Sequence, residues 1–242
     1  MLSLFHTFIS QPLYNALVFL YNVVPGGDFG IAIILTTILL KVLMLPLSKK
    51  QIESQKKMQE LQPKMKEIQA KHRDNKEEQT KALMQLYKEE QTNPFSGCLP
   101  LLVQIVFLIA IYHVIIRISQ AAFTINGSEL YAFVENPGTV NHLFLHIVDL
   151  ARPNILLAAL AALAQYFQTK MMLQNIPTPV KKEGASKGEP DFAAIMNKQM
   201  LYIAPAITLF IGATFPAALS LYWLTSTLFM LFQQIVIFRK QS

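Results

Sequence analysis

The sequence predicts an all-α polytopic membrane protein with five transmembrane helices, a cytoplasmic helical hairpin and an N-terminal interfacial helix. Of the 242 residues, 52% are hydrophobic, in runs too long for a soluble domain of this size. The net charge of +6 is concentrated in a few segments. One apolar run also contains a lysine, Lys41, which costs about 2.5 to 3.5 kcal/mol inside a bilayer unless it faces water or protein. The rest of the chain has to supply that environment.

The N-terminal 24 residues carry apolar side chains three or four positions apart, which predicts a helix. Pro12 divides the segment, and neither half reaches the roughly 20 residues needed to span a bilayer. Two readings remain: a helix in the membrane interface, or a partly buried cap on the bundle. The first 28 residues lack the basic n-region and cleavage site of a signal peptide, so we expect this segment to be retained.

Chain breakers separate the other segments. The turn at 25–28 precedes the first span, Asn93 and Pro94 precede the second, and Phe215 and Pro216 divide the last two. Residues 72–76 divide the charged segment into two helices, the first of which Pro63 should kink or restart. The predicted segments are an interfacial amphipathic helix (1–24), span 1 (29–47), the cytoplasmic hairpin (48–92), span 2 (95–116), an external loop with a short amphipathic segment (117–152), span 3 (154–173), a cytoplasmic loop (174–198), span 4 (200–215), span 5 (217–238) and a cytoplasmic tail (239–242).

The basic residues predict the orientation. The hairpin holds eleven Lys and Arg, residues 170–198 hold five and the tail two, whereas the opposite side has only Arg117 and Arg152. The positive-inside rule therefore places the hairpin, the second loop and the C-terminus in the cytoplasm, and the N-terminus outside.

The predicted spans contain no Asp or Glu, which excludes a diaspartyl protease, a carboxylate proton relay and an acidic sodium site. No catalytic or phosphate-binding motif is present, and the single cysteine, Cys98, permits neither an internal disulfide nor a cysteine metal cage. We therefore expect a protein that is not an enzyme and that uses no cofactor or metal.

Neutral polar residues lie in the spans near the level of Lys41. Each is explained either by a wet cavity or by a hydrogen bond between packed helices. For Lys41 itself, the alternative to a cavity is snorkelling, because six residues place it roughly 9 Å from Leu47. The candidate residues are Lys41, Thr37, Gln104, Tyr112, Gln165, Gln168, Ser220, Trp223 and Thr227.

Three motifs resemble the YidC family of membrane protein insertases, which includes the oxidase-assembly proteins of mitochondria and chloroplasts. They are LLKVLMLPLSKKQ followed by LQPK, NPFSGCLPLLVQ at the start of span 2, and FPAALSLYWLTSTLFMLFQQ in the last span. The resemblance covers nearly all of residues 29–238. It implies five spans around a cationic hydrophilic groove that is open to the cytoplasm and to lipid, with Lys41 as its basic residue.

The sequence departs from the family pattern at several positions. The family usually has arginine where Lys41 stands, and Lys41 offers a point charge without the bidentate fork. Val106 and Thr227 replace a common proline and a common asparagine. The periplasmic domain and additional N-terminal span of Gram-negative members are missing, so we expect the minimal form of the family.

The resemblance implies an insertase and chaperone of the bacterial plasma membrane, which moves hydrophobic segments of newly made proteins from the cytoplasm into the bilayer. Its partners would be nascent membrane proteins and membrane lipid, with the ribosome, the signal recognition particle or its receptor, and the Sec translocon as further candidates. We expect no recognition of nucleic acid sequence. A cationic cavity also fits a small-solute channel or transporter. Contact with newly made membrane proteins, the clients, without faster insertion fits a passive assembly scaffold.

Methionines are frequent on the predicted cytoplasmic side, where flexible side chains suit a surface that meets many apolar sequences. We expect Met58, Leu61 and Met65 of the hairpin to recruit clients, and crosslinkers at Met58 or Met65 to trap nascent chains. The alternative is that these methionines simply favour helix formation.

Overall fold

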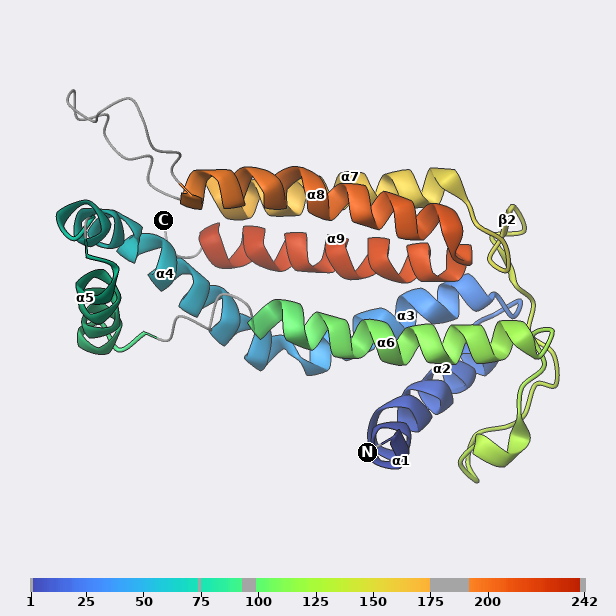
Figure 1. The fold of residues 1–242 in the computed structure, drawn as a ribbon. Coiled ribbons are helices and arrows are strands. Elements are labelled where there is room, and N and C mark those ends of the chain that lie inside the picture. Colours follow the sequence, from blue (N-terminus) through green and yellow to red (C-terminus); the bar gives the residue numbers. More distant parts are fainter. Residues whose placement is uncertain (1, 74, 93–98, 175–191, 240–242) are drawn as a thin grey trace.

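Within the described residues, the regular structure is helical apart from one two-stranded sheet. A computed structural model describes residues 2–73, 75–92, 99–174 and 192–239 (Figure 1). The elements are α1 (Leu2–Phe5), a π-helical turn η1 (His6–Ser10), α2 (Gln11–Val23), α3 (Phe29–Leu43), α4 (Leu45–Lys71), α5 (Lys76–Glu89), α6 (Leu99–Gln120), a 3-10 turn η3 (Gly127–Glu129), β1 (Leu143–Phe144), β2 (Val148–Asp149), α7 (Ile155–Gln174), α8 (Phe192–Thr214) and α9 (Ala217–Arg239).

Two groups of helices meet at α9. In Figure 1, α7, α8 and α9 lie side by side, and α3 and α6 run along the other side of α9. The shared core contains Leu17, Ile33, Ile111, Leu150 and Tyr222, each at most 2% exposed. The helices that carry most of the candidate polar residues are therefore packed neighbours.

The N-terminal helix packs on this bundle. α2 buries four side chains in the core, those of Leu13, Tyr14, Leu17 and Val18. Phe8, in the π-helical turn before α2, is exposed. This burial supports the reading of a partly buried cap. Pro12 does not interrupt the helix, because it lies at the start of α2, just after the π-helical turn, where a missing N–H is tolerated.

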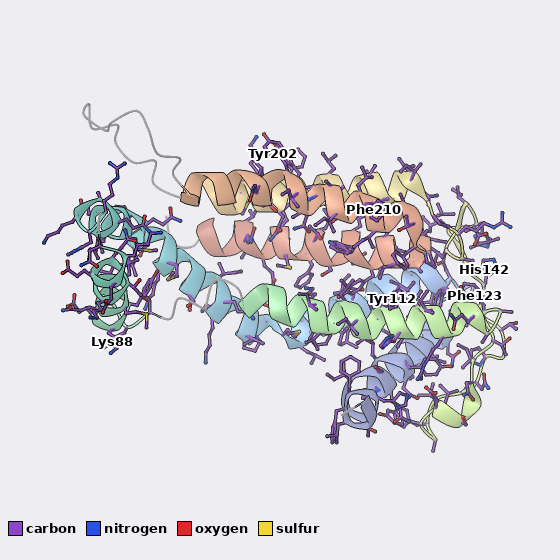
Figure 2. All side chains as sticks on the ribbon, in the orientation of Figure 1. Lys88, Tyr112, Phe123, His142, Tyr202 and Phe210 are labelled. Carbon is purple, nitrogen blue, oxygen red and sulfur yellow. The ribbon has the colours of Figure 1, made fainter. Side chains whose placement is uncertain are left out.

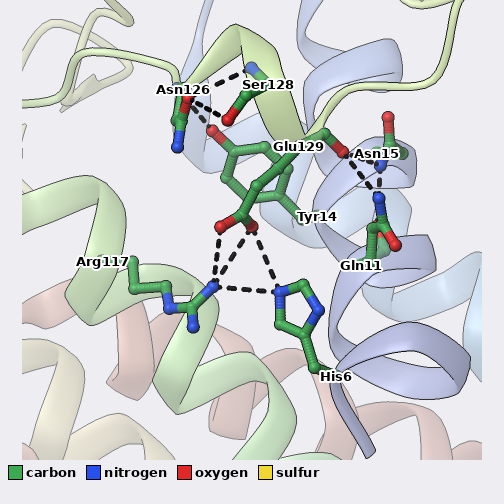
Figure 3. Close-up of polar contacts among 8 residues, drawn as sticks. All are labelled: His6, Gln11, Tyr14, Asn15, Arg117, Asn126, Ser128 and Glu129. Carbon is green, nitrogen blue, oxygen red and sulfur yellow. Dashed lines mark hydrogen bonds and ion pairs between the residues drawn. The ribbon is translucent and has the colours of Figure 1, made fainter. Parts of the chain in front are cut away.

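Polar side chains connect this N-terminal helix to the loop between α6 and α7, residues 121–154, which we call the outer loop (Figure 3). Asn15 Nδ2 donates to the Glu129 carbonyl at 2.9 Å, and Asn15 Oδ1 accepts from the Tyr131 N–H at 2.6 Å. The Glu129 carboxylate accepts from Arg117 NH1 of α6 at 3.0 and 3.1 Å, with His6 Nε2 3.1 Å from the same nitrogen. These contacts join three segments that are distant in the sequence.

The first apolar helix is shorter than the predicted span. α3 ends at Leu43, four residues before the expected end at Leu47, and the chain bends by 64° into α4. Pro46 explains the bend, since it occupies the first turn of α4, where its missing N–H costs nothing. Pro63, which was expected to kink or restart the hairpin's first helix, lies inside α4 without ending it. Because Pro63 is exposed, the carbonyl it leaves without a partner can be hydrated.

The helical hairpin consists of α4 and α5, and the chain turns between residues 72 and 76 as the sequence predicts. Asn75 caps α5 through Oδ1, which accepts from the N–H groups of Glu77 and Glu78 at 3.2 Å. Lys64 of α4 pairs with Glu90 just after α5, and this ion pair raises the pKa of Lys64. The pair is exposed, so packing and the cap contribute more to the hairpin than this charge does.

Two other segments differ from the prediction. α8 begins at Phe192, so residues 192–198 of the predicted loop are helical. The amphipathic segment of the outer loop is a two-stranded β-hairpin, in which Leu143 pairs with Asp149 and Phe144 with Val148. The two short strands, Leu143–Phe144 and Val148–Asp149, flank the turn at 145–147.

By length and composition, α9 is long and apolar enough to cross a bilayer over Ala217–Val236, within the part of the chain that the structure describes. Phe29–Leu43 and Leu45–Ser54 qualify together if they form one bent span. Three shorter apolar helices are Ile105–Gln120, Ile155–Met171 and Leu201–Thr214.

Asp28 holds the start of α3 against the outer loop. Its Oδ1 accepts from the N–H groups of Gly30 at 2.8 Å and Ile31 at 3.0 Å, and its Oδ2 accepts from the Leu145 N–H at 2.7 Å. Asp28 is only 6% exposed, so these donors have little access to water. One carboxylate therefore provides both a helix cap and a contact with the β-hairpin.

Replacing Asp28 with alanine should destabilise the fold by about 2 to 3 kcal/mol, since it removes a cap and leaves buried N–H groups without an acceptor. The unfolding midpoint in detergent measures this loss. Asp28→Asn is the matched control: it retains one oxygen for the cap and should lose less. Equal midpoints for the wild type and Asp28→Ala would contradict this role.

Candidate functional site

A polar cluster joins α7 and α9 through Gln165. Its Oε1 accepts from the Trp223 indole N–H at 3.3 Å and lies 3.5 Å from the Thr227 hydroxyl. Its amide nitrogen donates to Gln168 Oε1 at 3.3 Å. Trp223 and Thr227 lie four residues apart, one turn along the same face of α9. The structure thus brings four of the nine candidate residues together between two apolar helices.

Ser220, which lies one turn before Trp223 on α9, belongs to a packing contact with α8. Its hydroxyl donates to the carbonyl of Gly212 in α8 at 3.4 Å. A Cβ at Gly212 would lie 2.7 Å from both Ser220 Oγ and Ala158 Cβ, so only glycine fits this crossing of α7, α8 and α9. For Ser220, the structure supports the reading of a helix-packing hydrogen bond.

Thr37 and Tyr112 also make contacts that need no cavity. Thr37 is 1% exposed, and its hydroxyl donates to the Ile33 carbonyl one turn earlier at 2.7 Å. Tyr112 of α6, labelled in Figure 2, packs edge-on against Phe215 with ring centroids 5.7 Å apart. Phe215 adjoins the turn between α8 and α9, so Tyr112 lies beside that turn. The side chain of Gln104 lies outside the described residues.

Lys41 occupies the last turn of α3, three residues before the bend at Met44. Its side chain is partly buried. The carbonyl groups at a helix C-terminus carry partial negative charge, which favours a cation at this position. Because α3 packs against α9, this charge lies on a helix adjacent to the one that carries Trp223 and Thr227.

The sequence analysis did not identify several buried polar residues on α9 and in the first turns of α4. On α9, Ser226, Gln233 and Gln234 are 1%, 7% and 3% exposed. With Thr227 they form two rows, 226 with 233 and 227 with 234, and the seven-residue spacing keeps each row on one face. That spacing inside an apolar run was the available signal. Gln51 of α4 is also buried, at 9% exposure.

Two amides in this region have side-chain atoms without a hydrogen bond. They are Nε2 of Gln51, which is a donor, and Oε1 of Gln234, which is an acceptor. Buried polar atoms are normally paired, so these two atoms are exceptions to the usual pattern.

The hairpin residues expected to recruit clients lie mostly toward the interior of the hairpin. Leu61 is buried, and Met65 Sδ accepts from the Tyr87 hydroxyl of α5 at 3.6 Å. Burial raises the pKa of Tyr87, which keeps this hydroxyl protonated as a donor at neutral pH. Met58 is partly buried, whereas Met84 on α5 is 49% exposed. Met84 lies on an open face of α5 among exposed polar side chains, which are Glu77, Thr80, Lys81, Gln85 and Lys88.

Replacing Gln165 with leucine should shift the emission of Trp223 to shorter wavelength, because the indole N–H loses its amide partner. Trp223 is the chain's only tryptophan, so intrinsic fluorescence reports this site alone. The stability cost should be about 1 kcal/mol, as for one hydrogen bond. Thr225→Val is the control, since Thr225 bonds only within α9, to the Leu221 carbonyl. Identical spectra for Gln165→Leu and wild type would disprove the contact.

Comparisons with known proteins place these features in a family. The sequence profile of the family described as 60Kd inner membrane protein matches residues 19–242. The "Membrane protein insertase YidC" of Francisella tularensis subsp. novicida (strain U112) is 32% identical over 236 residues, which cover 96% of this chain and 36% of that protein. Proteins with the same name from subsp. tularensis (strain WY96-3418) and subsp. holarctica (strain LVS) match to the same extent. The chain spans about a third of the length of these curated relatives.

Proposed function

Because the chain belongs to the 60Kd inner membrane protein family, which contains the YidC insertases, we propose that it is a membrane protein insertase. It takes hydrophobic segments of newly made proteins, its clients, from the cytoplasm into the bilayer. It makes and breaks no covalent bond in doing so. The relatives' name is the basis of this assignment, and the polar cluster around Gln165 is the structural observation that carries it.

The groove we propose is lined by the cluster of α7 and α9 and by Lys41 of α3. Gln165, Trp223 and Thr227 offer neutral hydrogen-bonding groups, and Lys41 adds a positive charge on the adjacent helix. Such groups lower the cost of moving a client's polar outer segment into the membrane, which is several kcal/mol for one charge. Burial of the client's apolar helix then supplies the free energy, without a nucleotide.

Five spans are part of this proposal. They comprise α3 with the first turns of α4, then α6, α7, α8 and α9. The cytoplasmic hairpin, the loop between α7 and α8 and the C-terminus face the cytoplasm of a bacterium, and the N-terminus lies outside. The distribution of Lys and Arg supports this orientation. A client's apolar segment leaves along α7 and α9, whose exposed side chains include Leu160, Leu163 and Phe232.

Nascent membrane proteins and lipid are the partners in this proposal. The ribosome, the signal recognition particle or its receptor, and the Sec translocon are candidates for the cytoplasmic side. The exposed Met84 face of α5 is the surface of the hairpin we propose for apolar client segments, together with Met58 at its partly buried position.

Reconstitution of the protein alone in liposomes tests this function against its rivals. A short single-span client should insert faster than into protein-free liposomes. A small-solute channel predicts solute flux through the same liposomes, and a passive scaffold predicts client contact with an unchanged insertion rate. Flux without insertion, or contact without acceleration, would reject the insertase.

A further inference from the structure

The outer β-hairpin presents an apolar tip. β1 and β2 are joined by Leu145, His146 and Ile147, and the turn is closed by a bond from the Ile147 N–H to the Phe144 carbonyl at 3.0 Å. Leu145 is 54% exposed and Ile147 83% exposed. Neither side chain belongs to the core, although the backbone of this β-hairpin is hydrogen-bonded within the hairpin and to Asp28.

The turn residues contradict local preference. Leu145 and His146 have φ of 50° and 61°, in the left-handed region where such turns normally place Asn or Gly. A branched side chain in this conformation is strained, and here it gains no burial in return. Positions that break a local rule without a packing benefit are often functional. An exposed leucine in this conformation therefore points to a contact outside the fold.

The β-hairpin is held firmly against the bundle. The Leu145 N–H donates to Asp28, and the Phe144 ring lies so close to Gly30 that a Cβ there would be 2.2 Å from it. At the other end of the segment, the Leu150 carbonyl accepts from the Ala218 N–H of α9 at 3.2 Å. The tip is thus fixed relative to the starts of α3 and α9.

The distribution of charge around the tip identifies the partner. Residues 143–148 contain no Asp, Glu, Lys or Arg and one exposed histidine, His146, whereas Asp149 lies 3.6 Å from His142 and 3.4 Å from Arg152 at the base. Residues 150–154 separate β2 from α7, whose first residues Ile155 and Leu156 are each 66% exposed. An apolar tip with a charged base, near a helix whose first residues are apolar and exposed, fits the boundary between headgroups and acyl chains.

We propose that the tip Leu145–Ile147 inserts into the lipid leaflet at the N-terminal end of α3. The β-hairpin then acts as an anchor that fixes the depth of α3 and α9 in the bilayer. The inference rests on the proposed placement of these helices across a membrane, and it does not depend on insertion of clients.

Fluorescent labels at single cysteines test this proposal in liposomes without clients. After Cys98→Ser, labels are placed at Ile147→Cys, at Phe210→Cys on the exposed side of α8 (70% exposed, Figure 2) and at Lys81→Cys on exposed α5. We expect nitroxide lipids to quench the labels at 147 and 210, and aqueous iodide to quench only the label at 81. Iodide quenching at 147 equal to that at 81, with lipid quenching retained at 210, overturns the anchor alone.

Loss of lipid quenching at both 210 and 147 would overturn the membrane placement together with the anchor. Insertion assays on the same labelled proteins report the proposed function separately. A second double variant, Leu145→Ser with Ile147→Ser, should shift the label at 210 to a different depth. An unchanged depth at 210 would show that the tip does not fix the helices, even if it touches lipid.

Discussion

Replacing Lys41 with alanine should reduce the insertion rate of clients with acidic outer segments about tenfold, which corresponds to about 1.4 kcal/mol of lost charge stabilisation. The reason is electrostatic: at the end of α3, Lys41 supplies the positive charge of the proposed groove. Clients whose outer segments are neutral should insert at nearly the wild-type rate. Insertion into liposomes, with the two client types compared in parallel, measures the difference.

Two variants sharpen the Lys41 experiment. Lys41→Arg keeps the charge and should retain most of the activity toward acidic clients. Lys50→Ala removes an exposed lysine of α4. It should change the insertion rate of neither client type, because exposed charges in water are screened. Equal loss for acidic and neutral clients in Lys41→Ala would assign Lys41 a structural role in place of an electrostatic one.

Replacing Gly212 with valine should destabilise the fold by about 1 to 3 kcal/mol and lower the yield of folded protein, because the added side chain forces α7 and α8 apart. The added Cβ meets Ala158 Cβ at 2.7 Å and Ala158 Cα at 3.1 Å, and a backbone atom cannot turn aside as a side chain can. The unfolding midpoint in detergent and the yield of folded protein measure the effect.

Ala206→Val is the matched control for Gly212→Val. Ala206 lies on the same helix but is exposed, so the β-branched side chain meets no neighbour within the fold and costs only helix propensity. Equal midpoints for the two variants would show that the close crossing of α7, α8 and α9 does not determine stability.

The helices were predictable because apolar runs and breakers are local signals. α9 begins at Ala217, where Phe215 and Pro216 predict a start, and α7 begins at Ile155, one residue from the predicted position. The hairpin turn at 72–76 was readable for the same reason. The bend at Met44 was not, since a proline two residues later is compatible both with a continuing span and with the first turn of a new helix.

The contacts of the polar residues were less predictable than the helices. Gln165 meets Trp223 and Thr227 across two helices whose sequences are apolar on nearly every face, so no stripe reveals how each helix is rotated. Ser220 and Thr37 carry hydroxyl groups as Thr227 of the cluster does, but their hydroxyls donate to backbone carbonyls. Composition alone does not separate these two outcomes, because both satisfy a hydroxyl inside an apolar environment.

Because the chain bends at Met44, a small change in the bend angle moves the far end of α4 much more than it moves residues near the bend. Its 27 residues extend for roughly 40 Å at 1.5 Å per residue. A rotation of about 5° at the bend displaces the far end by roughly 3.5 Å on that length, while Lys41, only three residues from the pivot, moves very little. The far end of α4 can therefore change position by several Å while Lys41 near the bend keeps its position in the bundle.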